Sequence, residues 1–245
     1  MTSTSPRFLG RTAVVTGAGS GIGRATAIGL AREGARVVGV GRNEPRLQSA
    51  AAEADGAAGR IEAFEADLMT DEGIQDVASR LAEECAILDF LVHSAGVHAI
   101  GSVASTPIEE LDREYRTNLR APYLLTQALI PMLQGAGGQI VFLNSSAVRR
   151  AVAGLGAYAA SKHALRGLAD ALREELNPHG IRVLTVYPGR TAGSMQEALH
   201  RLEGRPYRPD RLLQPEDVAA TIMDVLSLPR TAEVTDLHIR PMLKP

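Results

Sequence analysis

Cysteine and tryptophan are nearly absent from this sequence: Cys85 is the only cysteine, and no tryptophan occurs. A single cysteine excludes a disulfide within the chain and suits a reducing compartment. Long hydrophobic runs are also missing, since no stretch approaches the roughly eighteen uninterrupted apolar residues that a membrane helix needs. Met1–Arg11 is short and polar and has no apolar core of signal-peptide length. We therefore expect a cytoplasmic protein that does not enter membranes.

Neither sign of charge is in large excess, because 26 basic and 28 acidic residues leave a formal net charge of -2. This balance provides no long-range attraction to DNA, RNA or anionic membranes. The 6 histidines are scattered, and none forms a metal-binding pattern such as H-E-x-x-H. We expect no nucleic-acid partner, no membrane partner and no metal, and a small molecule as the ligand.

Short β-branched runs alternate with longer segments rich in alanine and leucine along almost the whole chain. Several of the short runs are apolar throughout, as is typical of parallel strands covered on both faces. The predicted strands are Thr12–Thr16, Arg36–Val40, Ile61–Glu65, Phe90–Ser94, Gln139–Asn144, Arg182–Tyr187 and Thr235–Ile239. No linker or repeat divides the 245 residues. The pattern predicts an α/β fold, a doubly wound parallel sheet with helices on both faces, as a single domain over residues 1–245.

The helix ends carry recognisable signals. Gly34 can take the left-handed turn that closes the first helix. Thr106, Pro107 and Glu109 predict another helix start, with a capping threonine and a proline at the first helical position. Pro215 predicts the start of the last helix in the same way. The segment Arg190–Gln214 breaks the alternation, and we interpret it as an excursion from the domain.

A glycine-rich turn, Gly17–Gly23, follows the first predicted strand and leads into a helical segment. Such a turn lets backbone N–H groups approach a pyrophosphate closely, at the positive end of the helix. The alternative is a tight turn that is merely rich in glycine. The position of the turn, after the first strand of an alternating pattern, favours a dinucleotide site.

The end of the second strand bears on the choice of cofactor. An acidic residue there would bind the adenosine ribose and favour NAD, but this chain has Gly41 followed by Arg42. A guanidinium can bind a 2′-phosphate with two charge-assisted hydrogen bonds, so we predict NADP(H). The alternative is an ordinary solvated arginine. Asp67, which precedes Leu68 after the third strand, could accept a hydrogen bond from the adenine amino group, or serve a local turn, or both.

Tyr158 and Lys162 are spaced i,i+4 in a helical segment, which places them on one helix face. A phenol has a pKa near 10, and a neighbouring ammonium together with an oxidised nicotinamide would lower it enough for acid–base catalysis. Ser145 lies where the fifth strand ends, the edge at which parallel sheets bind ligands. Its hydroxyl could bond a substrate oxygen. The alternative is that the serine caps the next turn, a role that we expect of Ser146 rather than of Ser145.

The order of these motifs resembles that of the short-chain dehydrogenases/reductases, over Thr12–Ile239. The resemblance implies a Rossmann-type sheet of about seven strands and a catalytic set of Asn118, Ser145, Tyr158 and Lys162. Asn118 would kink its helix and hold a water of the proton relay, while Lys162 would bind the nicotinamide ribose. Together, motifs and resemblance predict the cofactor-binding residues Gly17, Ser20, Gly21, Ile22, Gly23, Arg42, Asp67, Leu68, Ala95, Gly96, Tyr158, Lys162, Pro188, Gly189 and Thr191.

Three segments depart from the family pattern. The family has Asn-Asn-Ala-Gly after its fourth strand, and this chain has His93-Ser94-Ala95-Gly96, which changes the bonding that braces the turn. The family's threonine after Pro188-Gly189 is replaced by Gly193, so Thr191 is the candidate for that hydroxyl. The last strand also lacks the usual glycine-rich ending.

Residues 190–214 would form a substrate lid, as the resemblance implies and as the glycine and proline content permits. Met195, Leu199 and Leu202 predict a partly apolar pocket. Arginines in or near this region either select an acidic substrate or form a solvated face; they are Arg149, Arg150, Arg201, Arg205, Arg208 and Arg211. The resemblance also implies a homotetramer, or a homodimer, built on the helices that carry Asn118 and Tyr158.

The sequence thus predicts an NADP(H)-dependent oxidoreductase that interconverts a carbonyl and an alcohol by hydride transfer. The substrate expected is a small to medium, partly apolar ketone or secondary alcohol. The alternative is a catalytically silent dinucleotide-binding sensor or scaffold, because a fold does not guarantee turnover. Loss of Tyr158 or Lys162 would have favoured this alternative, and both are present.

Overall fold

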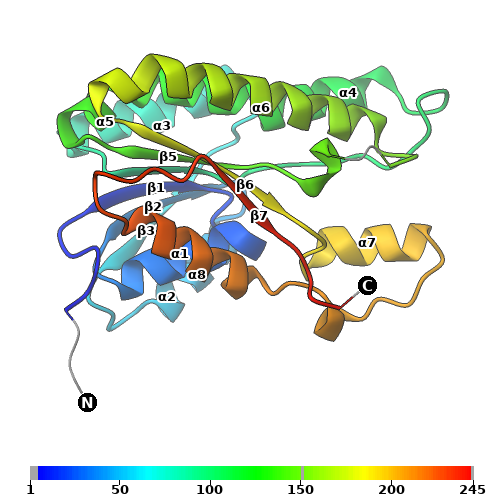
Figure 1. The fold of residues 1–245 in the computed structure, drawn as a ribbon, viewed down its shortest axis with the longest axis horizontal. Coiled ribbons are helices and arrows are strands. Elements are labelled where there is room, and N and C mark those ends of the chain that lie inside the picture. The colour runs from blue at the N-terminus through cyan, green and yellow to red at the C-terminus, as the bar shows by residue number, and fades with distance from the viewer. Residues whose placement is uncertain (1–4, 150–151, 244–245) are drawn as a thin grey trace.

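Seven parallel strands form one sheet in the computed structural model, which describes residues 5–149 and 152–243 (Figure 1). The strand order is β3-β2-β1-β4-β5-β6-β7. The strands are β1 (Thr12–Thr16), β2 (Arg36–Gly41), β3 (Arg60–Glu65), β4 (Phe90–His93), β5 (Gln139–Leu143), β6 (Arg182–Pro188) and β7 (Asp236–Ile239). Each strand predicted from the sequence is confirmed within one residue at either end. The predicted doubly wound parallel sheet is therefore the observed fold.

Helices cover both faces of the sheet, with α3, α4, α5 and α6 on one side and α1, α2 and α8 on the other (Figure 1). They are α1 (Gly21–Arg32), α2 (Glu44–Glu53), α3 (Asp71–Glu84), α4 (Ile108–Tyr115), α5 (Ala121–Ala136), α6 (Gly156–Leu176), α7 (Ser194–Leu202) and α8 (Pro215–Leu226). Each face has its own apolar core. Leu30 and Ile222 pack in one, and Leu125 and Leu165 in the other, all essentially inaccessible to solvent.

The strand order reverses between β1 and β4, which lie next to each other in the sheet. The chain moves from β1 to β2 on one side and returns to place β4 on the other side. Thr16 and His93, the last residues of these two strands, lie opposite each other in the parallel register. In open α/β sheets the crevice for a ligand forms outside the carboxyl ends of the strands at such a reversal.

One prediction about local structure is wrong. Thr106 does not cap α4, because its hydroxyl donates to the Ser102 carbonyl oxygen at 2.8 Å, and Pro107 rather than Thr106 precedes the first helical residue, Ile108. The segment 190–214, which was predicted as an excursion, contains helix α7 and a short 3₁₀ turn at Pro209–Arg211. The prediction of Pro215 as the first residue of α8 is confirmed.

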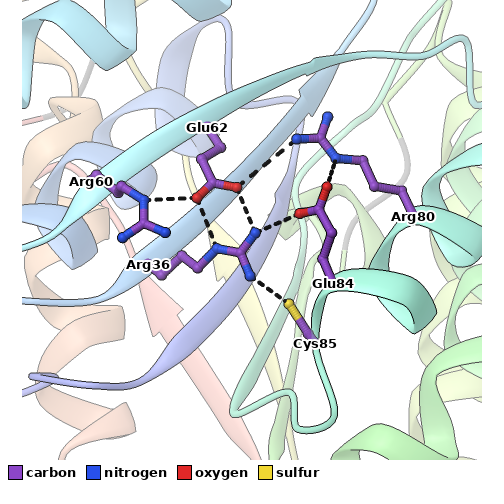
Figure 2. Close-up of polar contacts among 6 residues, drawn as sticks. All are labelled: Arg36, Arg60, Glu62, Arg80, Glu84 and Cys85. Atoms are coloured by element: carbon purple, nitrogen blue, oxygen red, sulfur yellow. Dashed lines mark hydrogen bonds and ion pairs between the residues drawn. The ribbon is translucent and has the colours of Figure 1, made fainter.

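A network of ion pairs joins β2, β3 and α3 at the end of the sheet opposite the crevice (Figure 2). Arg36 binds Glu62 in a bidentate manner, with Nε and Nη2 donating at 2.8 and 2.7 Å, and Nη2 also donates to Glu84 at 2.5 Å. Arg60 Nε donates to the same Glu62 carboxylate at 2.8 Å, and Arg36 Nη1 donates to Cys85 Sγ at 2.8 Å. The Arg36 guanidinium lowers the pKa of Glu62 to about 2, against the opposing effect of burial.

Candidate active site

The glycine turn after β1 is packed directly against the turn after β4. Gly17 has a φ of 70°, and a Cβ there would lie 2.9 Å from the Ala95 nitrogen, so a side chain is excluded on both grounds. The Thr16 hydroxyl accepts hydrogen bonds from the backbone nitrogens of Ser94 and Ala95, each at 3.0 Å. Sequence reasoning missed Thr16, although its place just before the glycine turn was visible.

Helix α1 begins at Gly21 and points its N-terminus into the crevice. A Cβ at Gly23 would lie 2.5 Å from the Gly17 carbonyl oxygen, so this glycine allows the turn and the helix to pack. Within the described part of the chain, the N-cap residue Ser20 makes no side-chain capping bond, and the first turn holds no acidic side chain. The first amides of α1 are therefore available to an anion such as a pyrophosphate.

A cavity of about 500 Å³ extends from the glycine turn across the ends of β2 and β3. Arg42 and Arg46 line it and are both solvent-exposed. Asp67 lines it as well, and its Oδ1 accepts from the Met69 nitrogen at 3.0 Å, so the local turn role applies to this residue. The predicted residues that line this cavity are Gly17, Ser20, Arg42, Asp67, Leu68, Ala95 and Gly96. Arg46, which lies in α2 four residues after Arg42, was missed by the sequence reasoning.

A second cavity, of about 390 Å³, shares Gly17, Ser20, Ala95 and Gly96 with the first. The other predicted residues that line it are Gly21, Ile22, Ser145, Tyr158, Lys162, Pro188, Gly189 and Thr191. Gly23 and Asn118 are the two predicted residues outside both linings, because they are buried behind them. The glycine cradle, the uncapped helix amides and the two joined cavities fit an extended dinucleotide.

Ser145 follows β5 and sits beside the helix that carries Tyr158. Its Oγ accepts from the Ala147 nitrogen at 3.1 Å, so Ser145 caps the next turn, and the expectation that Ser146 would do so is wrong. Asn144 holds this arrangement together. Its Oδ1 accepts from the Ser145 nitrogen at 2.8 Å, and its Nδ2 donates to the Lys162 carbonyl oxygen at 3.0 Å. The neighbouring asparagine, which sequence reasoning did not single out, thereby ties Ser145 to α6.

Lys162 is only 5% exposed and holds a fixed position. Its Nζ donates to the Leu143 carbonyl oxygen at 2.8 Å and lies 5.9 Å from the centre of the Tyr158 ring. Burial lowers the pKa of Lys162 to about 8, while the charge of Glu114 acts in the opposite direction. The amine thus stays mainly protonated at neutral pH, and its titration range lies close enough to physiological pH for added charge to shift its protonation.

Tyr158 faces the cavity, and burial dominates the pKa of its phenol. Burial raises this pKa, a hydrogen bond with Ser145 lowers it, and the charge of Glu114 raises it further. The expected lowering of the pKa requires an oxidised nicotinamide as well as the lysine, and it stays a prediction. In this structure desolvation of the phenolate is the larger effect, because the Lys162 ammonium is directed at the Leu143 carbonyl.

Asn118 lies in a π-helical turn, Arg116–Arg120, between α4 and α5. Its amide group is fully engaged: Oδ1 accepts from the Val97 nitrogen at 2.9 Å, and Nδ2 donates to the Val97 carbonyl oxygen at 2.9 Å and to Ser161 Oγ at 3.0 Å. The Ser161 hydroxyl in turn donates to the Tyr158 carbonyl oxygen at 2.9 Å. Asn118 therefore connects the loop after β4 to the backbone of the helix that carries the tyrosine.

Two further residues near Tyr158 were missed by the sequence reasoning. Glu114 is fully buried, its Oε1 accepts from the Ala99 nitrogen, and burial raises the pKa of its carboxyl group. His98 lies on the loop between these contacts, and its ring stands edge to face with the Tyr158 ring at 6.2 Å between centroids. Glu114 is four residues before Asn118, and this i,i+4 relationship was the only signal in the sequence.

His93, which departs from the family pattern, is explained by its buried contacts. His93 is buried, its Nε2 lies 2.8 Å from Thr126 Oγ1, and its ring stacks on Phe142 at 4.9 Å between centroids. Burial lowers the pKa of the imidazole to about 3. The histidine is therefore a neutral core residue that fixes β4 to α5.

A third pocket, which we call the side pocket, adjoins the predicted catalytic residues Ser145 and Tyr158 and has a volume of about 350 Å³. Tyr158 and Ser145 form one end of it, and helix α7 contributes Met195 and Leu199. Leu202, which was predicted to join them, is 63% exposed and does not line the pocket. Of the three predicted residues, Met195 and Leu199 thus contribute to the apolar part of the pocket.

The arginines noted in the sequence mostly lie away from the side pocket. Arg201 is 80% exposed and pairs with Glu197 on its own helix. A separate hollow outside the side pocket is lined by Arg205, Arg208 and Arg211. Arg149 is exposed, and Arg150 lies outside the described residues. Arg190, at the first position of the predicted lid, is the arginine that lines the side pocket.

The described residues contain neither a helix suited to cross a membrane nor a cluster placed to bind a metal. No helix among them is both long and apolar enough to cross a membrane. In the same residues, no group of three or more histidine, cysteine, aspartate or glutamate side chains is placed to hold a metal ion.

Known proteins resemble this chain over most of its length. A family model described as short chain dehydrogenase matches residues 11–203. The uncharacterized oxidoreductase YciK of Escherichia coli is 36% identical over 217 residues, which is 85% of this chain and 82% of YciK. Glycine betaine reductase ATRR of Emericella nidulans is 33% identical over 243 residues, which is 96% of this chain but only 19% of that protein.

Among solved structures, a metagenomic short-chain oxidoreductase in complex with NADP superposes with a TM-score of 0.84. It is 32% identical and is covered completely, while 97% of this chain takes part in the match. Fold, motif order and site geometry agree with these likenesses. The chain belongs to the short-chain dehydrogenase family of oxidoreductases.

Proposed function

We propose that the protein is an NADP(H)-dependent oxidoreductase that interconverts a carbonyl compound and an alcohol. The observation that carries this proposal is that Ser145, Tyr158 and Lys162 line one cavity, which is continuous with the glycine turn after β1. A nicotinamide cofactor bound there would supply or accept the hydride. The chain itself would hold the cofactor, orient the substrate and move the proton.

The cofactor half of the proposal assigns a binding partner to each part of a dinucleotide. The amides at the start of α1, with Ser20, would bind the pyrophosphate. Arg42 and Arg46 would bind a 2′-phosphate on the adenosine ribose. Gly41 stands where an acidic residue would favour NAD, so no carboxylate at that position would repel the phosphate. Asp67 would accept from the adenine amino group with a carboxylate oxygen.

For the chemical step, Tyr158 would transfer the proton to or from the substrate oxygen. In the reductive direction the phenol donates its proton to the carbonyl oxygen, and in the oxidative direction the phenolate takes the alcohol proton. A raised pKa keeps the phenol protonated at neutral pH, which supports the reductive role. Ser145 Oγ accepts from a backbone amide, which leaves its own proton to donate to the same substrate oxygen. Lys162 would bind the nicotinamide ribose and adjust the tyrosine by its charge.

The first experiment is titration of the protein with NADPH and with NADH, followed by the fluorescence of the reduced nicotinamide. The chain has no tryptophan, so the protein background is low. We expect NADPH to bind at least about tenfold more tightly than NADH, because two arginines are available to the 2′-phosphate. Tighter NADH binding would overturn the NADP(H) assignment, and binding of neither would overturn the proposed function.

The second experiment separates an enzyme from a silent dinucleotide-binding protein. Turnover is measured with NADPH on a panel of ketones and aldehydes, for the wild type and for Tyr158→Phe. We expect the variant to bind NADPH almost as the wild type does and to lose about 10²- to 10⁴-fold in turnover. Cofactor binding without reduction of any carbonyl would support the sensor or scaffold alternative.

A further inference from the structure

The side pocket next to Tyr158 and Ser145 is lined by both apolar and polar side chains. Apolar side chains form much of it, among them Val152, Leu155 and Met195. The polar side chains other than serine and tyrosine are His98, Arg190 and Gln196. Of these only Arg190 carries a full charge, and the described lining contains no carboxylate. Pro188 and Gly189 belong to this pocket and to the cofactor cavity, so the two spaces adjoin at the catalytic residues.

Each of the three polar side chains has a buried atom that lacks a hydrogen-bond partner among the described residues. These atoms are His98 Nε2, Arg190 Nη1 and Gln196 Oε1. Buried polar atoms in native proteins are nearly always bonded, so unpaired ones call for an explanation. Three of them on the wall of one pocket indicate a polar group of the ligand.

The backbone holds Arg190 at the rim of this pocket. The Gly189 nitrogen donates to the Ile239 carbonyl oxygen at 2.7 Å, and the Leu213 nitrogen donates to the Arg190 carbonyl oxygen at 3.1 Å. The side chain is held too, because Nη2 donates to Glu203 Oε1 at 2.6 Å. Nη1 is the part of the guanidinium that this ion pair leaves unused.

The charges around Arg190 favour an anion. Glu203, the carboxylate paired with Arg190, also lies 3.9 Å from Arg205 Nε. Arg205 lines a separate hollow, so Arg190 is the one full charge on the described lining of the side pocket, and its hydrogen bond to Glu203 engages Nη2. His98 adds no negative charge, and burial lowers the pKa of its imidazole.

We propose that the side pocket selects carbonyl substrates that carry a carboxylate, held by Arg190 Nη1 and by His98 Nε2 as a neutral hydrogen-bond donor. The inference rests on the proposed function, since the carbonyl of the same molecule is the one placed against Tyr158 and Ser145. The apolar wall receives the carbon chain between the two groups. The substrate class is therefore oxo acids and, in the oxidative direction, the corresponding hydroxy acids.

The experiment has a binding arm that needs no turnover. Hexanoate, hexan-1-ol and methyl hexanoate are titrated into the protein with saturating NADP⁺ by calorimetry. We expect hexanoate to bind about tenfold or more tightly than the two neutral probes, because the guanidinium bonds only the carboxylate with charge assistance. Equal binding of the three probes would overturn the proposal.

The variants test the assigned residue. Arg190→Gln should abolish the preference for hexanoate, and Arg190→Lys should retain part of it. The matched control is Arg201→Gln, which removes an exposed arginine from α7 outside the pocket and should leave the preference unchanged. Retained preference in Arg190→Gln, or a loss in Arg201→Gln of the same size, would overturn the assignment.

The turnover arm compares levulinate with methyl levulinate, and acetoacetate with methyl acetoacetate. We expect the acids to have about tenfold lower KM than their esters in the wild type, and Arg190→Gln to raise KM for the acids alone. Acids and esters reduced with equal KM would overturn this inference and leave the proposed function intact. Failure of the proposed function is distinct, because no carbonyl would then be reduced by the wild type whatever its charge.

Discussion

Asn118 and Val97 exchange two hydrogen bonds of 2.9 Å, one in each direction between the side-chain amide and the backbone. The same face of the chain, four residues earlier, carries Glu114, which accepts from the Ala99 nitrogen. The loop after β4 is therefore fixed at two points by one helical segment. His98 lies between these points, against Tyr158 and in the wall of the side pocket.

Asn118→Ala should weaken both the fold and the turnover. The change leaves the partly buried nitrogen and carbonyl of Val97 without their partner, so the free energy of unfolding should fall by about 1–2 kcal/mol. Urea denaturation at neutral pH measures this, and turnover with NADPH should fall as the loop carrying His98 loosens. Asn177→Ala, which removes an exposed side-chain bond to Glu233, is the control and should change neither quantity appreciably. Equal effects of the two variants would contradict the role given to Asn118.

Arg42→Gln should change cofactor preference without changing the fold. We expect the Kd for NADPH to rise about tenfold or more and the Kd for NADH to stay nearly constant, because only the first cofactor has a 2′-phosphate. Arg46→Gln should act in the same direction. Arg32→Gln, on α1 outside the cavity lining, is the matched control. A rise in Kd for both cofactors alike would place the arginines elsewhere in the binding site.

Glu62→Gln should make the protein less sensitive to acid. Ion pairing with Arg36 lowers the pKa of Glu62 from 4.5 to about 2, so the carboxylate contributes stability above pH 4.5. That contribution is lost as the pH falls through this interval towards 2. At pH 7 the variant should lose about 1–2 kcal/mol of unfolding free energy, less than the pKa difference alone implies because the side chain is partly exposed. Urea denaturation across the acidic range should show the two proteins converging, and parallel curves would contradict the prediction.

His93→Asn should also flatten the acid side of the stability profile, but over a different interval. Burial lowers the pKa of His93 from 6.5 to about 3, so below pH 6.5 the unfolded chain takes up a proton that the folded chain does not. The wild type therefore loses stability from pH 6.5 downwards, and the variant should lack this part of the slope. His179→Asn, which removes an exposed histidine, should keep the wild-type slope. The measurement is chemical denaturation at several pH values between neutral and the onset of acid unfolding.

Much of this architecture could be predicted because it is written in short-range patterns. An apolar run such as the one in β5 suits only a strand covered on both faces, and Gly17 and Gly23 mark a turn that no side chain could enter. The i,i+4 spacing of Tyr158 and Lys162 places both on one helix face wherever the helix packs. These features depend on neighbouring residues alone, so the local sequence is sufficient to predict them.

The predictions that were wrong concern choices between equivalent local partners. Thr106 and Ser146 had the right chemistry for capping, yet Thr106 bonds the Ser102 carbonyl and Ser145 takes the cap. The energy differences between such local bonds are small, and the path of the surrounding chain decides among them. The raised pKa of Tyr158 could not be predicted for a related reason, because the extent of its burial depends on segments remote in sequence.

The order of motifs along the chain was enough to predict the parallel sheet and the glycine turn and to single out Tyr158 and Lys162 as candidate site residues, because each motif is a short pattern of neighbouring residues. Packing alone settled what the buried polar groups do. It brought Glu114 to Ala99, His93 to Thr126 and Lys162 to the Leu143 carbonyl, across 15, 33 and 19 residues of sequence. It also left Arg190 with an unused nitrogen on a pocket wall. A buried polar atom must find its partner wherever the folded chain supplies one, and no local pattern specifies which distant segment that will be.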